Sequence, residues 1–360
     1  MKNNLRINQV EPLLTNSDIL AVNKYLKSGG WLTEHNVTKT FENNIAHFVN
    51  RKFATAVPNG TIAIYLSLLA AGLGKNDKVA VPNLTMIATI NAVLWAGAKP
   101  VLVDVDESLC MSPEKLRSIK NLKAVIYVPL NGRTKNGIEI SKFCKEKSIL
   151  LIEDSAHALG SKYFNGKNCG SLGDISIFSF TPHKLITTGQ GGMILCDKKS
   201  IYNNLQKIKT FNRKKDKQDW HEGFGLNFKI TDIQSSLGIS QLNRIDEIIK
   251  NKLKIFNLYK KINSNKYKLG TYSDYELPWF FEIFSNNKKD TDALFYLLKS
   301  NNIEARYFYP ALSKQKYLNK VLKTDLNYSE KIFQRLLWLP SSNGLSKKEQ
   351  TLIVDIINSV

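Results

Sequence analysis

Short apolar stretches alternate with amphipathic ones through the first half of the chain. The apolar stretches are predicted to be strands at residues 53–57, 78–81, 100–103, 124–128, 150–153, 175–180 and 191–195. Between them apolar residues recur at helical spacing, which predicts helices at 37–48, 62–71, 86–96, 112–119 and 137–147. Strands that are apolar on both faces and separated by helices are typical of a mostly parallel sheet covered on both sides. The pattern therefore predicts an α/β fold.

A long, Lys-rich amphipathic segment at 244–262 follows a predicted helix at 231–241 and separates the alternating region from the rest. Beyond it the pattern predicts a strand at 279–284, a helix at 291–300 and a terminal helix from Lys347. We interpret 244–262 as a connector between two domains. The predicted large domain covers residues 1–250, with helical segments at 14–52, and a smaller C-terminal α+β domain covers 251–360.

Composition narrows the class of protein. A chain of 360 residues with 43% hydrophobic content is long enough for a sizeable core. Residues 1–12 lack the apolar core of a signal peptide, and no apolar run approaches the roughly 20 residues that span a bilayer. The four cysteines and five histidines are dispersed without disulfide-scaffold or zinc-site spacing. We expect a cytoplasmic protein without a structural metal.

The net charge of +20 raises the hypothesis of nucleic-acid binding. The positive charge comes from 43 Lys and only eight Arg, scattered among many Asn and Ile. We interpret this scatter as a compositional bias toward Lys and Asn, and it argues against a surface that binds nucleic acid. A basic field would also help to steer an anionic substrate, such as one that carries a diphosphate.

Three local features point to chemistry. The strand at 53–57 is followed by Gly60-Thr61 and an apolar helix, which places backbone N–H groups where an anion binds. Asp154 follows a buried strand, at the sheet edge where α/β proteins bind ligands. Lys184 follows the strand at 175–180 and precedes a glycine-rich turn, Thr187–Gly192. Each feature alone is weak, because carboxylates at strand ends and surface lysines are common.

Together these features resemble the DegT/DnrJ/EryC1/StrS sugar aminotransferase family within the fold-type I pyridoxal-phosphate enzymes. The matching segments, in order, are Asn59–Thr61, Val81–Thr85, Glu153–Ala156, Gly173-Asp174, Phe178–Phe180, Lys184, Gly189–Gly192, Gly225–Asn227 and Leu339–Ser341. Their order and spacing run through nearly the whole chain. The resemblance implies the fold-type I α/β fold and pyridoxal 5'-phosphate as cofactor.

The resemblance also implies roles for the central residues. Lys184 would hold the cofactor as a Schiff base and shuttle a proton as the freed amine. Asp154 would pair with the pyridine nitrogen and keep it protonated. His157 matches the position that hydrogen-bonds near the ring's phenolic oxygen; the alternative is a helix-face histidine satisfied by backbone. Lys184 also argues against a 3-dehydratase activity, because the 3-dehydratases of this family have His at that position.

In the family, the cofactor phosphate sits on the turn matched here by Gly60 and Thr61, helped by Ser179. The Asn matched by Asn227 reaches the phosphate from the neighbouring subunit, which implies a homodimer with shared sites. The alternative is that Asn227 is only a structural residue of a turn. The family usually places an aromatic residue on the cofactor ring where this chain has Met86, so we expect looser stacking, since sulfur is only a partial substitute.

Family members commonly use L-glutamate as donor and a keto sugar on a nucleotide diphosphate as acceptor. Residues 219–229, and 303–306 with Tyr309, are similar to GDP-perosamine synthase-like members. The resemblance thus makes Trp220, His221, Arg306 and Tyr309 substrate-binding candidates. A guanidinium fork suits a diphosphate, which favours Arg306. For Trp220 a packing role is an equal alternative.

The resulting hypothesis is amino transfer to C4 of a nucleotide-linked 4-keto-6-deoxyhexose, for a surface polysaccharide such as O-antigen or another glycan. A 3-keto sugar, or a sugar on UDP or dTDP, is the alternative. Two other classes remain open: a non-catalytic, regulatory protein that binds pyridoxal phosphate, and a basic nucleic-acid-binding protein.

Overall fold

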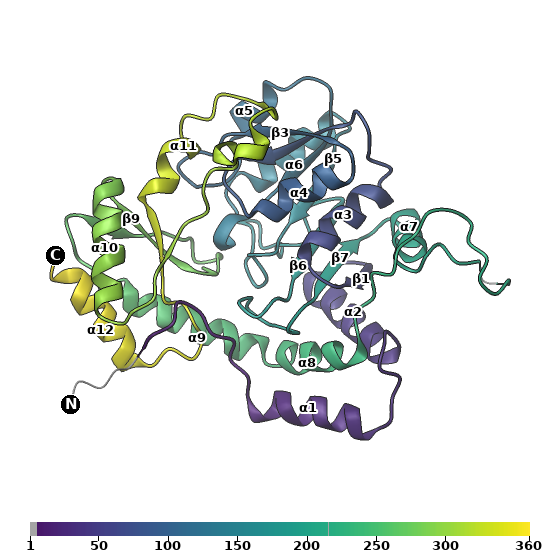
Figure 1. Cartoon of the computed structure of the whole chain (residues 1–360), viewed down its shortest axis with the longest axis horizontal. Coiled ribbons are helices and arrows are strands. Elements are labelled where there is room, and N and C mark those ends of the chain that lie inside the picture. The colour runs from purple at the N-terminus through teal and green to yellow at the C-terminus, as the bar shows by residue number, and fades with distance from the viewer. Residues whose placement is uncertain (1–5, 215) are drawn as a thin grey trace.

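The computed structural model describes residues 6–214 and 216–360, and strands and helices alternate through its first part (Figure 1). The strands of this part are β1 (Phe53–Val57), β2 (Lys78–Pro82), β3 (Lys99–Val103), β4 (Leu122–Tyr127), β5 (Leu150–Asp154), β6 (Ile175–Ser179) and β7 (Gly192–Cys196). The helices are α1 (Asn16–Lys27), α2 (Asn36–Val49), α3 (Gly60–Ala70), α4 (Ile87–Trp95), α5 (Pro113–Arg117), α6 (Gly137–Glu146), α7 (Lys199–Lys209), α8 (Asp232–Leu242) and α9 (Ile245–Tyr259). The predicted strands of this region are all present, with ends shifted by at most a few residues.

These seven strands lie in one sheet, in the order β1-β7-β6-β5-β4-β2-β3, and β11 (Leu322–Lys323) adds an eighth strand beside β3. β7 runs antiparallel to β1 and β6, and the other neighbours are parallel. The predicted α/β fold with a mostly parallel sheet is therefore confirmed.

Burial on both faces explains why the strands are apolar throughout. In β6, Ile177 belongs to the core that includes Leu66 of α3, whereas its neighbour Phe178 belongs to the core that includes Phe41 of α2. Successive side chains of a strand point to opposite faces. Both faces of the sheet are thus covered by helices, as the pattern predicted.

The C-terminal part carries a second, antiparallel sheet with the order β10-β12-β9-β8. Its strands are β8 (Tyr267–Leu269), β9 (Phe281–Ser285), β10 (Arg306–Tyr307) and β12 (Leu336–Leu339), and its helices are α10 (Lys288–Ser300), α11 (Ser329–Ile332) and α12 (Lys347–Asn358). Phe281 of β9, Leu294 of α10 and Ile353 of α12 share one buried core. This is an α+β unit of the predicted kind.

Helix α9 passes from one core to the other. Its first residues, Ile245 and Ile248, are buried with α2, whereas Ile255 and Tyr259 are buried with the second sheet. Ile7, near the start of the chain, also lies in the second core. The division into domains at residue 250 falls inside this helix and stays a prediction.

A buried polar cluster joins the two sheets. Arg133 forms an ion pair with Glu282 of β9, and both side chains are almost fully buried. The backbone N–H groups of Trp279 and Phe280 donate to the backbone and side-chain oxygens of Asn131, at 3.2 and 3.0 Å. The predicted strand at 279–284 therefore begins only at Phe281, because Trp279 and Phe280 are bonded to the large domain instead of to a strand.

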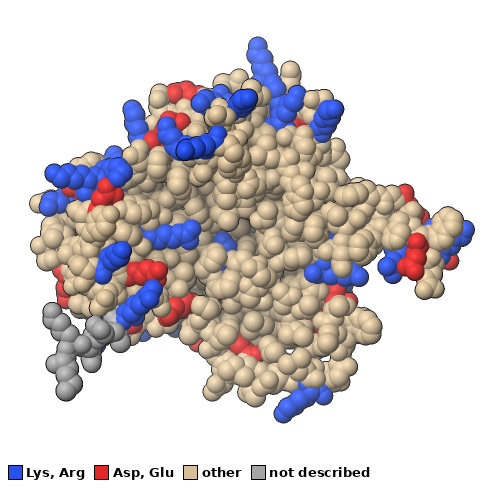
Figure 2. Space-filling view, in the orientation of Figure 1, with Lys and Arg blue, Asp and Glu red and all other residues tan. Residues whose placement is uncertain are grey.

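On the face shown in Figure 2, Lys and Arg are spread around the rim among Asp and Glu and form no continuous basic surface.

The four cysteines are free and buried. Within residues 6–214 and 216–360, no helix is both long and apolar enough to cross a membrane.

Candidate active site

A pocket of about 760 Å³ lies where β2, β4, β5 and β6 end, the edge at which open α/β sheets bind ligands. It brings together nine of the twelve predicted site residues, namely Gly60, Thr61, Met86, Asp154, His157, Ser179, Lys184, Arg306 and Tyr309. The remaining three, Trp220, His221 and Asn227, do not line it.

One end of the pocket is an anion cradle built by the start of α3. Asn59 caps the helix, and its Oδ1 accepts from the N–H of Ile62 at 3.0 Å. A Cβ on Gly60 would lie 3.1 Å from the Cβ of Ser179, and a Cβ on Gly192 would lie 2.6 Å from the backbone of Asn59. The turn is packed closely against β6 and β7: glycine is needed at position 192, and a side chain at position 60 would press on Ser179. The first amides of α3 stay open to a phosphate.

Asp154 ends β5, lines the same pocket and is 5% exposed. Its Oδ2 accepts from the hydroxyl of Thr89 at 2.9 Å, and its Oδ1 accepts from the N–H of Ala156 at 3.3 Å. Burial raises the pKa of Asp154, and the Thr89 hydroxyl, the Ala156 N–H and the charge of Lys184 act in the opposite direction. The carboxylate is held in one orientation for a cationic partner.

Thr89 is a functional candidate that the sequence analysis missed. It lies in α4, 65 residues from Asp154. The one local signal is its position a helical turn after Thr85, whose hydroxyl lies 3.4 Å from its own. A Thr-x-x-x-Thr pair at the start of an apolar helix does not by itself indicate a carboxylate nearby.

Replacing Thr89 with valine should raise the pKa of Asp154 further, because the mutation removes a hydrogen bond to the ionised form. We expect the acid limb of the kcat/KM profile for glutamate to move to higher pH by about one unit. Thr89→Ser keeps the hydroxyl and should leave the limb in place. An unchanged acid limb in Thr89→Val would show that this hydroxyl does not tune Asp154.

Lys184 follows β6 in a short turn and is half-buried. Its Nζ lies 4.0 Å from the centroid of the Trp279 ring. Burial lowers the pKa of Lys184 to about 7, with Asp154 acting to raise it and Arg306 to lower it. An amine with this pKa is largely available as a nucleophile and as a proton carrier near neutral pH.

His157 lies on the face of the same indole. Its ring is stacked on Trp279 with centroids 3.9 Å apart and planes at 17°. Burial, then the charges of Lys184 and His183, hold the pKa of His157 well below its usual range, so the imidazole is neutral. Its Nδ1 is buried and makes no hydrogen bond to another described residue. A buried polar atom without a described partner, in a residue that lines the pocket, fits a ligand with a ring oxygen.

Trp279 was not predicted as a site residue, and no local signal marks it. Its indole N–H donates to the backbone oxygen of His183 at 2.9 Å, which ties it to the Lys184 turn. Because the bonds to Asn131 also hold its backbone, the ring is fixed between the two sheets. Trp279 therefore positions both Lys184 and His157.

The set of groups in the pocket fits pyridoxal phosphate. The amides of α3 suit the phosphate, the Asp154 carboxylate suits a protonated ring nitrogen, and the unpartnered Nδ1 of His157 suits a phenolic oxygen. Lys184 supplies the amine for the aldehyde. The donors and acceptors of the pocket match those of the cofactor one by one.

Met86 lies at the start of α4, lines the pocket and is 40% exposed. Its sulfur accepts from the N–H of Ala88 at 3.1 Å, so the side chain serves as the helix cap. A sulfur engaged in this way is a poorer cover for a cofactor ring than an aromatic face would be.

We expect Met86→Phe to tighten cofactor binding by about two- to tenfold, the gain from one stacked aromatic pair. The dissociation constant of pyridoxal phosphate, from titration of the cofactor-free protein, measures this. Met86→Leu, which adds no ring, should bind as the wild type does. Equal affinity of the Phe and wild-type proteins would mean that position 86 does not cover the cofactor.

The segment with Trp220 and His221 stands out from the body of the protein after α7 (Figure 1). Trp220 is 62% exposed, and the Nδ1 of His221 lies 2.8 Å from the backbone oxygen of Phe211 within the same loop. Asn227 follows this loop and forms a bridge with Thr210. The chain by itself does not bring these three residues to the pocket.

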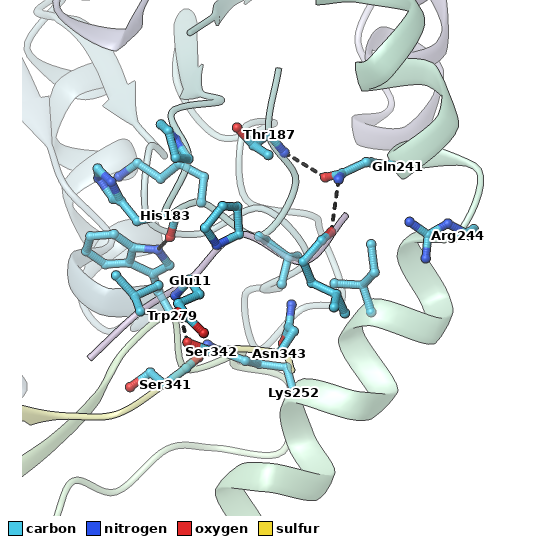
Figure 3. A pocket seen from close by; sticks show the side chains of 17 residues that line it. Glu11, His183, Thr187, Gln241, Arg244, Lys252, Trp279, Ser341, Ser342 and Asn343 are labelled. Carbon is cyan, nitrogen blue, oxygen red and sulfur yellow. Dashed lines mark hydrogen bonds between the residues drawn. The ribbon is translucent and has the colours of Figure 1, made fainter. Parts of the chain in front are cut away.

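A second pocket, of about 490 Å³, shares His183 and Lys184 with the first and is also lined by Trp279; Figure 3 shows this second pocket. Gln241 accepts from the N–H of Thr187 at 2.8 Å and donates to the backbone oxygen of Leu13 at 3.3 Å. The Nζ of Lys252 donates to the backbone oxygen of Ser341, and burial lowers the pKa of Lys252 to about 7. These contacts tie the Lys184 turn to α8 and to the N-terminal segment.

Comparison with known proteins agrees with this geometry. Residues 12–358 match a family described as the DegT/DnrJ/EryC1/StrS aminotransferase family. The chain is 34% identical over 357 residues to a GDP-perosamine synthase of Escherichia coli O157:H7, covering 97% of this chain and 96% of that protein. It is 32% identical over 361 residues to a GDP-perosamine synthase of Vibrio cholerae, covering 97% of each.

Among solved structures, the chain is similar to PseC of Helicobacter pylori, an aminotransferase involved in the biosynthesis of pseudoaminic acid. The TM-score is 0.92, with 22% identity and 99% of each chain covered. The predicted resemblance and the predicted fold are both confirmed.

Proposed function

The chain belongs to the DegT/DnrJ/EryC1/StrS aminotransferase family and uses pyridoxal phosphate; from this we propose that it moves an amino group from L-glutamate to C4 of a nucleotide-linked 4-keto-6-deoxyhexose. The observation that carries the proposal is the placement of Lys184, Asp154 and the Gly60 turn around one pocket. The identity of about one third to two GDP-perosamine synthases, along nearly the whole chain, supports the substrate class.

In this proposal the chain's own residues bind, orient and move a proton. Bound pyridoxal phosphate supplies an electron-accepting ring, which lets a proton leave the carbon that bears the amino group. Lys184 would hold the cofactor through its aldehyde and, as a free amine, would carry the proton. Asp154 would keep the ring nitrogen protonated, and His157 would donate to the phenolic oxygen. Gly60, Thr61 and Ser179 would hold the phosphate.

Arg306 and Tyr309 line the same pocket and are the proposed substrate contacts within one chain. Trp220 and His221 lie too far out for this role in their own chain and would act on the site of a second copy. The product would feed a surface polysaccharide such as O-antigen or another glycan. We place the reaction in the cytoplasm, where buried free cysteines such as these stay reduced.

We further propose a homodimer with shared sites. Asn227 lies outside the pocket of its own chain, in keeping with a role at the pocket of the partner. Two protruding parts expose large apolar side chains: α1 and its flanks expose Leu20 and Trp31, and the loop after α7 exposes Trp220 and Phe224. Exposed apolar surface of this kind is typical of an interface between subunits.

The visible spectrum tests the proposal and separates it from its alternatives. Purified protein loaded with pyridoxal phosphate should show the band of a lysine-bound cofactor, glutamate should bleach it with release of 2-oxoglutarate, and a 4-keto sugar nucleotide should restore it. GDP-, UDP- and dTDP-linked 4-keto and 3-keto sugars are compared in parallel. The sugar that restores the band fastest identifies the nucleotide and the carbon.

Each alternative predicts a different result. A band that glutamate leaves unchanged would indicate a non-catalytic cofactor-binding protein. A protein without the band that is retained on DNA, with a steep dependence on salt, would indicate nucleic-acid binding. Bleaching by glutamate with restoration by none of the keto sugars would refute the substrate class and leave the aminotransferase activity standing.

A further inference from the structure

The amine of Lys184 lies on the face of an aromatic ring and is not paired with a carboxylate. Its Nζ is 4.0 Å from the centroid of the Trp279 ring. Across residues 6–214 and 216–360, no Asp or Glu oxygen comes within 4.0 Å of this nitrogen. Asp154, a carboxylate that lines the cofactor pocket, acts on the amine through its charge alone. A cation within about 6 Å of an indole centroid is attracted by the negative face of the ring, so Trp279 is the group that holds this amine.

The Trp279 ring lies beside the cofactor pocket without lining it. Trp279 lines the second pocket and a crevice of about 290 Å³, both of which it shares with Lys184. Lys184 also lines the cofactor pocket, whereas Trp279 is not one of the residues around that pocket. Because the lysine stem is long and flexible, its amine can swing between the ring and the cofactor pocket. Trp279 therefore acts on the chemistry only through Lys184.

The ring is fixed in place from several sides. Its N–H donates to the backbone oxygen of His183 at 2.9 Å (Figure 3), and the backbone N–H of Trp279 donates to the backbone oxygen of Asn131 at 3.2 Å. The ring stacks with those of His157 and Phe280, with centroids 3.9 and 3.8 Å apart. Trp279 is 5% exposed. A ring that is held in this way in a close-packed interior does not turn away from the lysine.

Both charge states of the amine are present near neutral pH. Burial lowers the pKa of Lys184 to about 7, Asp154 on β5 acts to raise it, and Arg306 on β10 acts to lower it. His157 and His183, which feel the charge of the same amine, have pKa values below the usual range and are neutral. The charged amine thus has no carboxylate at contact distance, and the face of an aromatic ring stabilises a cation most in such a desolvated place.

We propose that the face of the Trp279 ring is the seat of the Lys184 amine whenever this amine is not bonded to the cofactor, an inference that rests on the role of Lys184 in the proposed function. In that function the amine is set free each time a substrate takes its place on the cofactor. The seat keeps the amine within reach of the pocket. It also keeps the amine from pairing with Asp154, whose charge is needed at the ring nitrogen. Trp279 is thus a positioning residue.

Tryptophan analogues with one, two or three ring fluorines test this contact, because fluorine weakens the negative face of the ring and leaves its shape nearly unchanged. Each analogue is placed at position 279 alone, in the full chain without cofactor. Competitive labelling of amines with acetic anhydride across pH, read by mass spectrometry of the peptide, gives the pKa of Lys184. A weaker ring face stabilises the charged amine less. We therefore expect the pKa of Lys184 to fall stepwise, by about half a unit to one unit with three fluorines.

Two controls separate the ring face from general effects of the analogues. Lys252 is a second buried lysine whose pKa is also lowered to about 7, and its Nζ lies 4.8 Å from the centroid of the Phe281 ring. Phe281 carries no fluorine, so the pKa of Lys252, read in the same samples, should not move. The same analogues at position 95, where Trp95 is 54% exposed and stacks on Tyr65, should leave Lys184 as in the wild type.

The capture of the cofactor gives a second readout. The neutral amine is the nucleophile that takes up pyridoxal phosphate. The acid limb of the rate at which the cofactor-free protein forms the visible band should therefore move to lower pH, by the same amount as the pKa of Lys184 falls. Lys184→Ala should form no band with the wild-type ring or with any analogue.

Several results would overturn the proposal. A pKa of Lys184 that stays unchanged or rises with fluorination would show that the ring face does not hold the amine. An equal fall at Lys252, or a fall with the analogues at position 95, would assign the effect to the analogue itself. A band formed by Lys184→Ala would instead overturn the role of Lys184 in the proposed function. The labelling result needs no cofactor and would still decide the contact between the amine and the ring.

Discussion

Replacing Lys184 with alanine should abolish the visible band of the bound cofactor and lower kcat by at least about 10⁴-fold, the upper range for one positioned acid-base group. Lys184 is the only lysine among the described residues that line the cofactor pocket, so no other amine replaces it. The spectrum of the variant loaded with pyridoxal phosphate and its single turnover with glutamate measure the two effects. Burial, with the charge of Arg306 acting in the same direction and that of Asp154 against it, lowers the pKa of Lys184 to about 7, so that the amine is reactive near neutral pH.

Lys252 offers a matched control for this substitution. Its pKa is also lowered to about 7 by burial, but its Nζ donates to the backbone of Ser341 in the second pocket. Lys252→Met removes the charge and keeps most of the volume, so we expect the band to persist at full strength. A band retained in Lys184→Ala, or lost in a folded Lys252→Met, would show that the wrong lysine has been assigned.

The second large effect is expected for Asp154→Asn, which should slow the glutamate half-reaction by about 10²- to 10⁴-fold. Asparagine keeps the size of the side chain: its oxygen can accept from the Ala156 N–H, and its NH2 can donate to the hydroxyl oxygen of Thr89, so the geometry is largely preserved. What is lost is the negative charge that keeps a proton on the ring nitrogen. The rate of bleaching after mixing with glutamate, at matched cofactor occupancy, measures the effect.

Asp197→Asn is the control for Asp154. Asp197 follows β7, which runs antiparallel to β6, so it lies at the opposite edge of the sheet, where its carboxylate pairs with Arg51 at 3.5 Å. Its replacement should leave the glutamate half-reaction within about twofold of the wild type, as for most surface changes. A wild-type rate in Asp154→Asn would exclude charge on the ring nitrogen as its role.

Much of the fold follows from local patterns. Strands β4, β5 and β6 are apolar because both of their faces are covered, so a run of apolar residues between helices was enough to place them. The Gly60 turn, Asp154 and Lys184 were also found, because each stands next to a strand end in the sequence. Residues at the carboxyl ends of parallel strands meet at one edge of the sheet without any long-range information.

Other site residues depend on contacts between distant segments. Thr89 reaches Asp154 from α4, and Trp279 reaches Lys184 from the start of the second sheet. The position of Trp279 depends on Asn131, which adopts a left-handed backbone conformation with φ of 58° and accepts from the N–H groups of Trp279 and Phe280, just before β9. No pattern of residue spacing in the sequence indicates such a contact.

The candidate substrate-binding residues also fall into two groups, those that line the pocket and those that lie outside it. Arg306 and Tyr309, which a short similar segment singled out, line the pocket, but their aromatic neighbour Trp338 was not foreseen. Trp220, His221 and Asn227 were predicted with equal weight and lie outside the pocket of their own chain. A motif identifies a residue of the site without saying from which copy of the chain it comes.

The sequence by itself determined the α/β fold, the family and the pair Lys184 and Asp154, because strand burial, glycine turns and strand-end positions are encoded over a few neighbouring residues. Only the tertiary structure shows what surrounds that pair: the neutral His157, the lowered pKa of Lys184, the hydroxyl that donates to Asp154 and the guanidinium of Arg306 beside Trp338. Burial and electrostatic fields arise from all atoms that surround a group in space. They exist only when segments far apart in the sequence have been packed together.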